Sequence, residues 1–143
     1  MSDTLSCVEV HTEWDIVNAR GLGRDLAKQL GFGTVDQARI TTAVSELARN
    51  IYLYAPGGKI CIESVNHPER RGLKMIASDT GPGIEDIGKA MEDGYTTSGG
   101  LGAGLPGVKR LMDEFTIHSS AGQGTEIITT KWLRSSAGTV ASR

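Results

Sequence analysis

The sequence is short of cysteine, and the little that is present excludes a disulfide-rich secreted framework. Only Cys7 and Cys61 occur in 143 residues, without CxxC spacing. Such a pair is more typical of two separate thiols in core strands, with a disulfide or a metal role as the alternative. The N-terminus also lacks the basic-then-apolar form of a signal peptide, so the sequence predicts a cytoplasmic protein.

An excess of basic charge and a long apolar run are also missing. Fifteen basic against seventeen acidic residues leave a formal net charge of −2, whereas broad nucleic-acid binding needs a basic surface. No uncharged apolar run reaches membrane-spanning length. We therefore expect neither a nucleic acid nor a membrane as partner. The 38% of hydrophobic residues excludes a wholly disordered chain.

Glycine is what the sequence has in excess. Its 19 glycines are roughly double the usual share. Nine of them fall within residues 81–107: Gly81, Gly83, Gly88, Gly94, Gly99, Gly100, Gly102, Gly104 and Gly107. A segment in which a third of the residues have no side chain cannot be ordinary packed helix or strand.

Hydrophobic periodicity predicts one α/β domain over residues 1–134, followed by a disordered tail at 135–143. Helices are expected at 13–30, 34–54, 84–91 and 105–114. Strands are expected at 5–12, 59–65, 73–79, 115–120 and 125–133, the last four as two hairpins. Capping boxes at 12–15 and 34–37 would begin the first two helices. The order predicts a two-layer sandwich, a mixed and mostly antiparallel sheet with helices on one face.

The second predicted helix carries Glu46 and Asn50, which lie four residues apart and therefore project from one face. An asparagine oxygen suits a hard cation, and a nearby carboxylate can orient or deprotonate a nucleophile. The alternative is a solvated helix face on which Glu46 pairs with Arg49.

Asp79, Gly81 and Gly83 follow the end of an apolar strand. A carboxylate there can accept the amino group of adenine, and the two glycines let the backbone approach the base. The alternative is an ordinary turn capped by Asp79.

A glycine loop at 96–107 leads into an amphipathic helix, which is typical of a phosphate site. A flexible linker is the alternative. No GxxxxGK[ST] motif is present, and the GxGxxG match at 102–107 follows no predicted strand, which weakens a dinucleotide-binding interpretation. In the segment 122–126, Thr125 either forms part of a hairpin turn or completes the polar wall of a base pocket.

The order of these motifs resembles the ATP-binding fold shared by gyrase, Hsp90, histidine kinases and MutL, the GHKL superfamily. The resemblance covers residues 5–133. The segments VSELARNIYLYA and SGGLGAGLPGVKRLMDEF are similar to the switch-protein serine/threonine kinases, an anti-sigma-factor kinase family of stress-signalling partner-switching modules. The phosphoacceptor-histidine domain of the histidine kinases has no counterpart in the sequence.

The resemblance implies a role for each motif, with ATP and Mg²⁺ as cofactors. Glu46 matches the catalytic glutamate, Asn50 the magnesium ligand and Asp79 the adenine-binding aspartate. The base pocket is matched by Gly81, Gly83 and Thr125. The phosphate loop and lid are matched by Gly99, Gly100, Leu101, Gly102, Ala103 and Gly104.

The function that follows is phosphoryl transfer from MgATP to a serine or threonine of a partner protein. By the resemblance, that partner is a sulfate-transporter-and-anti-sigma-antagonist (STAS) domain of a stressosome-like scaffold, and a downstream regulator is then activated. The alternative is a non-catalytic, ATP-gated anti-sigma-type module that sequesters a sigma factor or an enzyme, with the nucleotide merely setting its conformation. A dinucleotide oxidoreductase is a third, weaker candidate.

Overall fold

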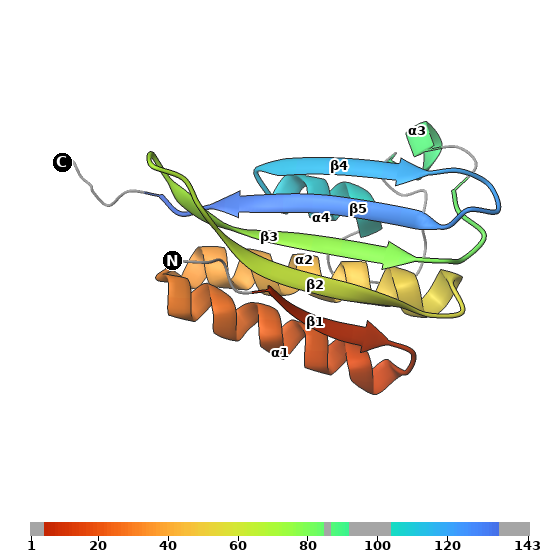
Figure 1. The fold of residues 1–143 in the computed structure, drawn as a ribbon, viewed down its shortest axis with the longest axis horizontal. Coiled ribbons are helices and arrows are strands. Elements are labelled where there is room, and N and C mark those ends of the chain that lie inside the picture. The colour runs from red at the N-terminus through yellow and green to blue at the C-terminus, as the bar shows by residue number, and fades with distance from the viewer. Residues whose placement is uncertain (1–4, 85–86, 92–103, 135–143) are drawn as a thin grey trace.

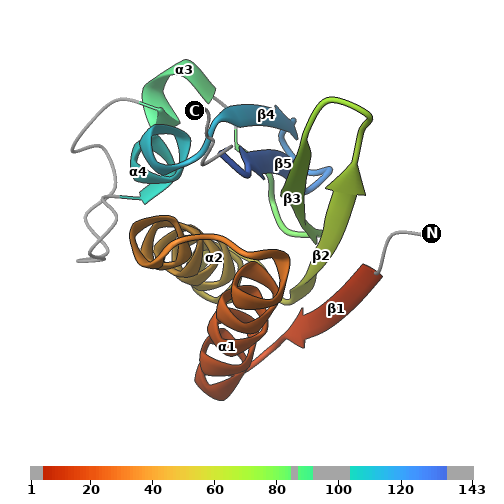
Figure 2. The ribbon, with the colours of Figure 1, turned by 90° about the vertical axis from the view of Figure 1, so that its left-hand side faces the viewer.

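Residues 5–84, 87–91 and 104–134 are described by the computed structural model, and they form a sheet layered against helices (Figure 1). The strands are β1 (Leu5–Val10), β2 (Gly58–Asn66), β3 (Arg71–Asp79), β4 (Glu114–Ser119) and β5 (Thr125–Trp132). The helices are α1 (Glu13–Leu30), α2 (Thr34–Tyr54), α3 (Ile87–Ala90) and α4 (Gly104–Leu111). Figure 2 shows α1, α2 and α4 on one side of the sheet, and no described element covers its other side.

The sheet has the strand order β1-β2-β3-β5-β4, and each of these four ladders is antiparallel. This confirms the expected two-layer sandwich and both expected hairpins, and the described sheet is antiparallel throughout rather than mixed. The order places β1 and β4 at the edges and β3 in the centre. Because β3 and β5 run antiparallel, the end of β3 lies beside the start of β5, at the right of Figure 1.

The core lies between the sheet and α2. Alternate residues of a strand point to opposite faces, and those of β2 and β3 that face the helices are fully buried, including Ile60, Ile62, Leu73 and Met75. The facing stripe of α2 has helical spacing: Ile40, Ala43, Val44, Leu47 and Ile51. Among the described residues, no helix has the length and hydropathy needed to span a membrane.

The start of α1 follows the expected capping pattern, whereas the start of α2 does not. Asp15 Oδ2 accepts the Thr12 N–H at 2.9 Å, and the helix ends at Leu30, where Gly31 is the C-cap with φ 95°. The predicted capping box at 34–37 is wrong, because Thr34 is already helical and Gly33 is the N-cap. The Gln37 side chain instead donates to the Phe32 carbonyl at 2.7 Å.

The helix predicted at 105–114 also ends earlier than expected, at Leu111. Asp113 turns the chain into the sheet, because its N–H donates to the Thr130 carbonyl at 2.9 Å. Its carboxylate accepts the Trp132 N–H at 2.7 Å. Helical periodicity continues through this segment, but these sheet contacts override it. The predicted tail at 135–143 lies outside the described residues.

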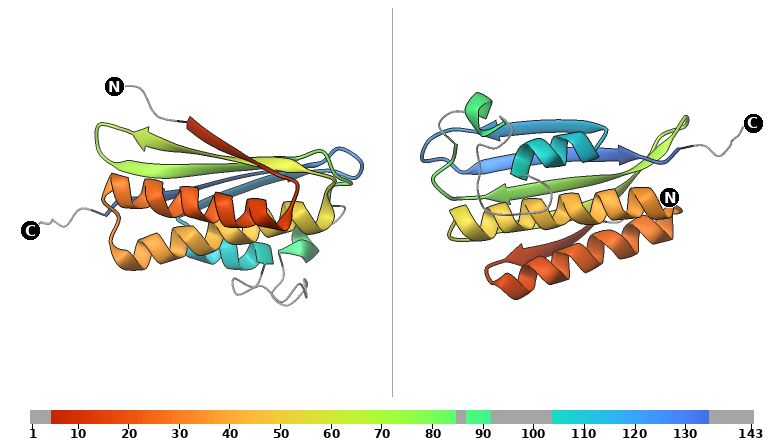
Figure 3. Two further views of the ribbon diagram at one scale, coloured as in Figure 1. Left: turned by 90° about the horizontal axis from the view of Figure 1, so that it is seen from below. Right: turned by 180° about the vertical axis from the view of Figure 1, so that it is seen from behind.

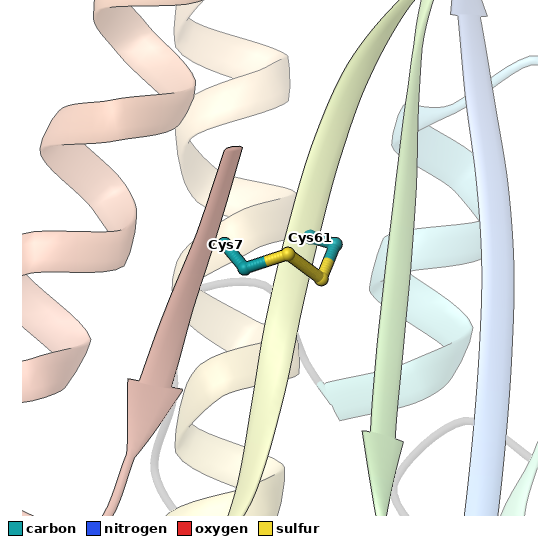
Figure 4. The surroundings of a disulfide bond; sticks show 2 residues. All are labelled: Cys7 and Cys61. Carbon is teal, nitrogen blue, oxygen red and sulfur yellow. A yellow bond between two sulfur atoms is a disulfide. The ribbon is translucent and has the colours of Figure 1, made fainter. Parts of the chain in front are cut away.

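The expectation of two separate thiols is wrong, because Cys7 and Cys61 form a disulfide (Figure 4). The two residues are direct partners in the β1–β2 ladder, and their Cα atoms lie 4.0 Å apart. Fifty-four positions separate them in sequence, so only the register of the two strands brings them together.

Asp15 gives α1 a pH-dependent stabilisation. Hydrogen bonds from the backbone N–H groups of His11 and Thr12 lower the pKa of Asp15 below its usual value. A lowered pKa stabilises the fold above the ordinary aspartate pKa, and this contribution is lost as the pH falls through the folded-state pKa. We expect Asp15→Ala to lower Tm at pH 7, and we expect the difference in Tm between the variant and wild type to be smaller in acid. Thermal unfolding across pH, with exposed Asp25→Ala as the control, checks this. A difference that is constant with pH would contradict it.

Candidate active site

Helix α2, whose last turn packs against the end of the sheet at which β3 terminates, carries a carboxylate and a carboxamide. The Glu46 side chain is only 3% exposed, and Arg49 Nη1 donates to its Oε2 at 2.9 Å. Asn50 lies one turn beyond Glu46 and is partly buried. The pairing with Arg49 expected on a solvated face is present, but the burial of Glu46 contradicts the solvated face itself.

The ion pair between Arg49 and Glu46 predicts a coupling that stability measurements detect. Removing one partner of a buried pair leaves a charged group with fewer hydrogen bonds. We expect Arg49→Met to lower the free energy of unfolding by about 1–3 kcal/mol, and by less in a Glu46→Gln background. Denaturant unfolding of the two single variants and the double variant measures this. Additive effects would show that the two side chains are not coupled.

Asp79 is the last residue of β3, and it has one cross-strand partner on each side. The register pairs it with Gly58 of β2 and with Thr125 of β5. Asp79 is partly buried, and its Oδ1 accepts the Gly81 N–H at 2.8 Å. The turn expected as the alternative is therefore present, and it holds the carboxylate in a fixed orientation beside α2.

Glycines allow the backbone to approach this aspartate closely. Gly83 has φ 79°, and a Cβ there would overlap the Ser120 carbonyl. Gly124 has φ 81°, and its Cβ would overlap the Asp79 carbonyl. A Cβ on Gly81 would lie 2.8 Å from the Cβ of Ala55, the residue that follows α2. These contacts bring the β3 exit, the β4–β5 turn and the end of α2 together.

The Thr125 hydroxyl lies beside a second hydroxyl, that of Ser119, which the sequence analysis did not identify. Its Oγ1 lies 2.7 Å from Ser119 Oγ, which also accepts the Ile84 N–H at 2.8 Å. Ser119 was missed because nothing in its local sequence marks it. The signal that could have found it is the hairpin, since Ser119 and Thr125 are cross-strand partners. The serine thus connects the threonine to the segment that follows Gly83.

The structure therefore gathers Asp79, Gly81, Gly83 and Thr125 at the end of β3, while Glu46 and Asn50 lie on α2, whose last turn packs against this end. A Cβ added to Gly58, the neighbour of Asp79 in the sheet, would lie 3.0 Å from Ile51 Cγ2 of α2. Figure 3 shows α2 running along the sheet toward this end. Gly99, Gly100, Leu101, Gly102 and Ala103 lie outside the described residues, whereas Gly104 begins α4 with φ 72°.

The chemistry of this donor set fits a nucleotide with a magnesium ion. A partly buried carboxylate flanked by glycines can accept an exocyclic amino group. No cluster of three or more His, Cys, Asp or Glu side chains suited to a metal occurs in the described part of the chain. Mg²⁺ commonly binds through substrate phosphates and waters with one or two protein oxygens, and Asn50 offers one.

Comparison with known proteins gives consistent matches. Residues 35–135 match the family described as histidine kinase-, DNA gyrase B- and HSP90-like ATPases. Serine/threonine-protein kinase RsbT of Bacillus subtilis is 72% identical over 129 residues, covering 90% of this chain and 97% of that protein. An anti-sigma F factor of a Thermoanaerobacter species is 33% identical over 121 residues, covering 82% and 85%.

A solved structure extends the likeness to the fold. It contains the RsbU and RsbW domains of a Mycobacterium tuberculosis protein, and the TM-score is 0.63 at 18% identity. The match covers 94% of this chain and 33% of that longer chain. At this identity the likeness establishes the two-layer fold alone.

Proposed function

The chain belongs to the GHKL ATPases and, within them, to the family of serine/threonine-protein kinase RsbT, and we propose that it phosphorylates a STAS-domain partner. The reaction is transfer of the γ-phosphoryl group of ATP to a serine or threonine hydroxyl. The observation that carries this proposal is the buried Glu46 carboxylate one helical turn from Asn50. A module that only binds nucleotide does not need such a carboxylate.

The adenine end of the nucleotide is assigned to the β3 exit. Asp79 accepts the exocyclic amino group of the base, while its Oδ1 is oriented by the Gly81 N–H. Gly81 and Gly83 leave room for the base beside the backbone. The Thr125 hydroxyl, hydrogen-bonded to Ser119, lines the same pocket and helps to select the base by hydrogen bonding.

The phosphate end is assigned to α2 and to the glycine loop. Asn50 contributes an oxygen to Mg²⁺, which neutralises phosphate charge when it is bound. The backbone N–H groups of Gly99, Gly100, Leu101, Gly102, Ala103 and Gly104 bind the phosphates. This assignment is supported by the sequence pattern, by the family and by the position of Gly104 at the start of α4.

In the chemical step, Glu46 acts as the general base. It accepts the proton of the partner's hydroxyl as that oxygen bonds to the γ-phosphorus, and the bond to the leaving ADP breaks. The Arg49 contact orients the carboxylate and balances its charge in a buried environment. Positioning of the reactants supplies most of the remaining rate enhancement.

We assign this activity to a domain spanning residues 1–134 with a tail at 135–143, acting in the cytoplasm. Binding and phosphorylation of the STAS partner are two parts of one switch, in which modification weakens the complex and releases the kinase to a downstream regulator. A second candidate is a non-catalytic ATP-gated binding module, which the 33% identity to an anti-sigma F factor favours.

Incubation with labelled MgATP and purified STAS-domain proteins tests the proposal. We expect acid-stable phosphoserine or phosphothreonine on the partner, together with ADP in equal amount. A stable complex that forms without transfer would favour the second candidate. Failure both to bind ATP and to bind any STAS domain would refute both.

A further inference from the structure

The disulfide lies on the face of the sheet opposite the helices. Val8 and Val10 of β1 pack toward the core, so the alternate residue Cys7 points to the other face. Cys61 likewise alternates with Ile60 and Ile62, both of which are fully buried under the helices. Figure 4 shows the bond bridging the two strands.

This location makes the bond accessible to a small molecule. Cys7 is exposed, and Cys61 retains 8% of its surface. β1 is an edge strand, and the described helices all lie on the other side of the sheet (Figure 2). A reagent can therefore reach the Cys7 sulfur without opening the core.

The two sulfurs do not depend on their bond to stay adjacent. Six consecutive residue pairs align β1 with β2, from Leu5 with Glu63 to Val10 with Gly58. Val10 is fully buried, which fixes the register, because a slip by one residue would turn it out to solvent. Reduction would therefore leave two thiols poised to form the same bond again.

We propose that Cys7 and Cys61 are a reversible oxidation site whose co-substrate is a low-molecular-weight disulfide of the glutathione type. The Cys7 thiolate attacks one sulfur of that disulfide and releases one small thiol, which leaves a mixed disulfide on Cys7. The Cys61 thiolate then attacks the Cys7 sulfur and displaces the second small thiol. The protein loses two electrons and two protons, and the small disulfide gains them.

Oxidation fixes the edge strand where it approaches the end of the sheet that carries Asp79. Val10, Gly58, Asp79 and Thr125 form one cross-strand row, and the bond lies three residues before Val10. The next residue, His11, has its ring against Gly57, where a Cβ would come within 2.6 Å of Nδ1. The bond therefore restrains the outermost strand of this row.

Alkylation and mass spectrometry of the intact chain, equilibrated with glutathione and its disulfide, test the site. We expect no alkylated cysteine in oxidising buffer, two in reducing buffer, and full return in both directions. Amide exchange in β1 should slow by about tenfold or more on oxidation. The disulfide still ties β1 to β2 when the hydrogen bonds of the edge ladder break, so the strand cannot separate from the sheet. None of these measurements requires nucleotide or partner.

Cys7→Ser and Cys61→Ser serve as matched variants, each first checked for wild-type circular dichroism and ATP affinity. Neither should change its β1 exchange with redox conditions. Cys61→Ser should retain glutathione on Cys7 more readily than Cys7→Ser retains it on Cys61. Two alkylatable thiols persisting in oxidising buffer, a bond that glutathione cannot reverse, or equal β1 exchange in both forms would overturn the proposal.

Discussion

Glu46→Gln is expected to slow phosphoryl transfer by about 10²–10⁴-fold, the usual contribution of a general base. Glutamine has nearly the same shape but cannot accept the hydroxyl proton. ATP affinity should remain close to that of wild type, because the base acts on the partner's hydroxyl and not on the nucleotide. Single-turnover transfer to a STAS-domain protein measures the rate, and titration with ATP measures the affinity.

Glu126→Gln is a matched control for this experiment. Glu126 is exposed on β5 between the buried residues Thr125 and Ile127, so its side chain points to the face of the sheet opposite α2, and its loss should leave transfer unchanged. Because Arg49 loses a charged partner, the Glu46→Gln protein must also be shown to remain folded at the assay temperature. Near-normal transfer by a folded Glu46→Gln protein would remove Glu46 from the chemical step.

Asp79→Asn is expected to weaken ATP binding by about 10–150-fold, which corresponds to about 1.5–3 kcal/mol for a hydrogen bond to a charged group. The asparagine Oδ1 can still accept the Gly81 N–H, so the turn after β3 should persist. The new amide nitrogen, however, cannot accept the amino group of adenine. Isothermal titration with ATP gives the affinities, and Asp25→Asn on α1 is the exposed control.

Inosine triphosphate separates loss of the base contact from general damage to the pocket. It carries an oxygen where ATP carries the amino group, so wild type should prefer ATP strongly. Asp79→Asn should lose most of that preference, because the contact that discriminates is already gone. A variant that binds ATP as wild type does, or that keeps the full preference, would place the base elsewhere.

Local sequence determined most of the elements and identified the candidate site residues. Helical spacing in α2 and alternation in β2 and β3 report directly on burial, because each face meets either core or water. Asp79 and the glycines after it could be recognised because a strand exit needs particular backbone conformations there. Glu46 and Asn50 could be paired because a helix places residues four apart on one face.

Helix starts and ends were less predictable because they depend on contacts outside the helix. The end of α4 is set by Asp113 bonding to β5, and the start of α2 by Gly33 and the Phe32 carbonyl. Lys131 is a further example. Its ammonium group is buried and donates to the Leu111 carbonyl at 2.8 Å, with Asp36 of α2 at 3.7 Å. Periodicity alone would not place a lysine inside.

For the two cysteines, by contrast, the expectation of separate thiols was wrong. Composition determined that two thiols exist, but only the β1–β2 register decided that they meet, across 54 positions. The same holds for Ser119 with Thr125 and for the burial of Glu46. Local pattern reports what each residue does within its own element, whereas pairing between distant elements is selected by how the whole core packs.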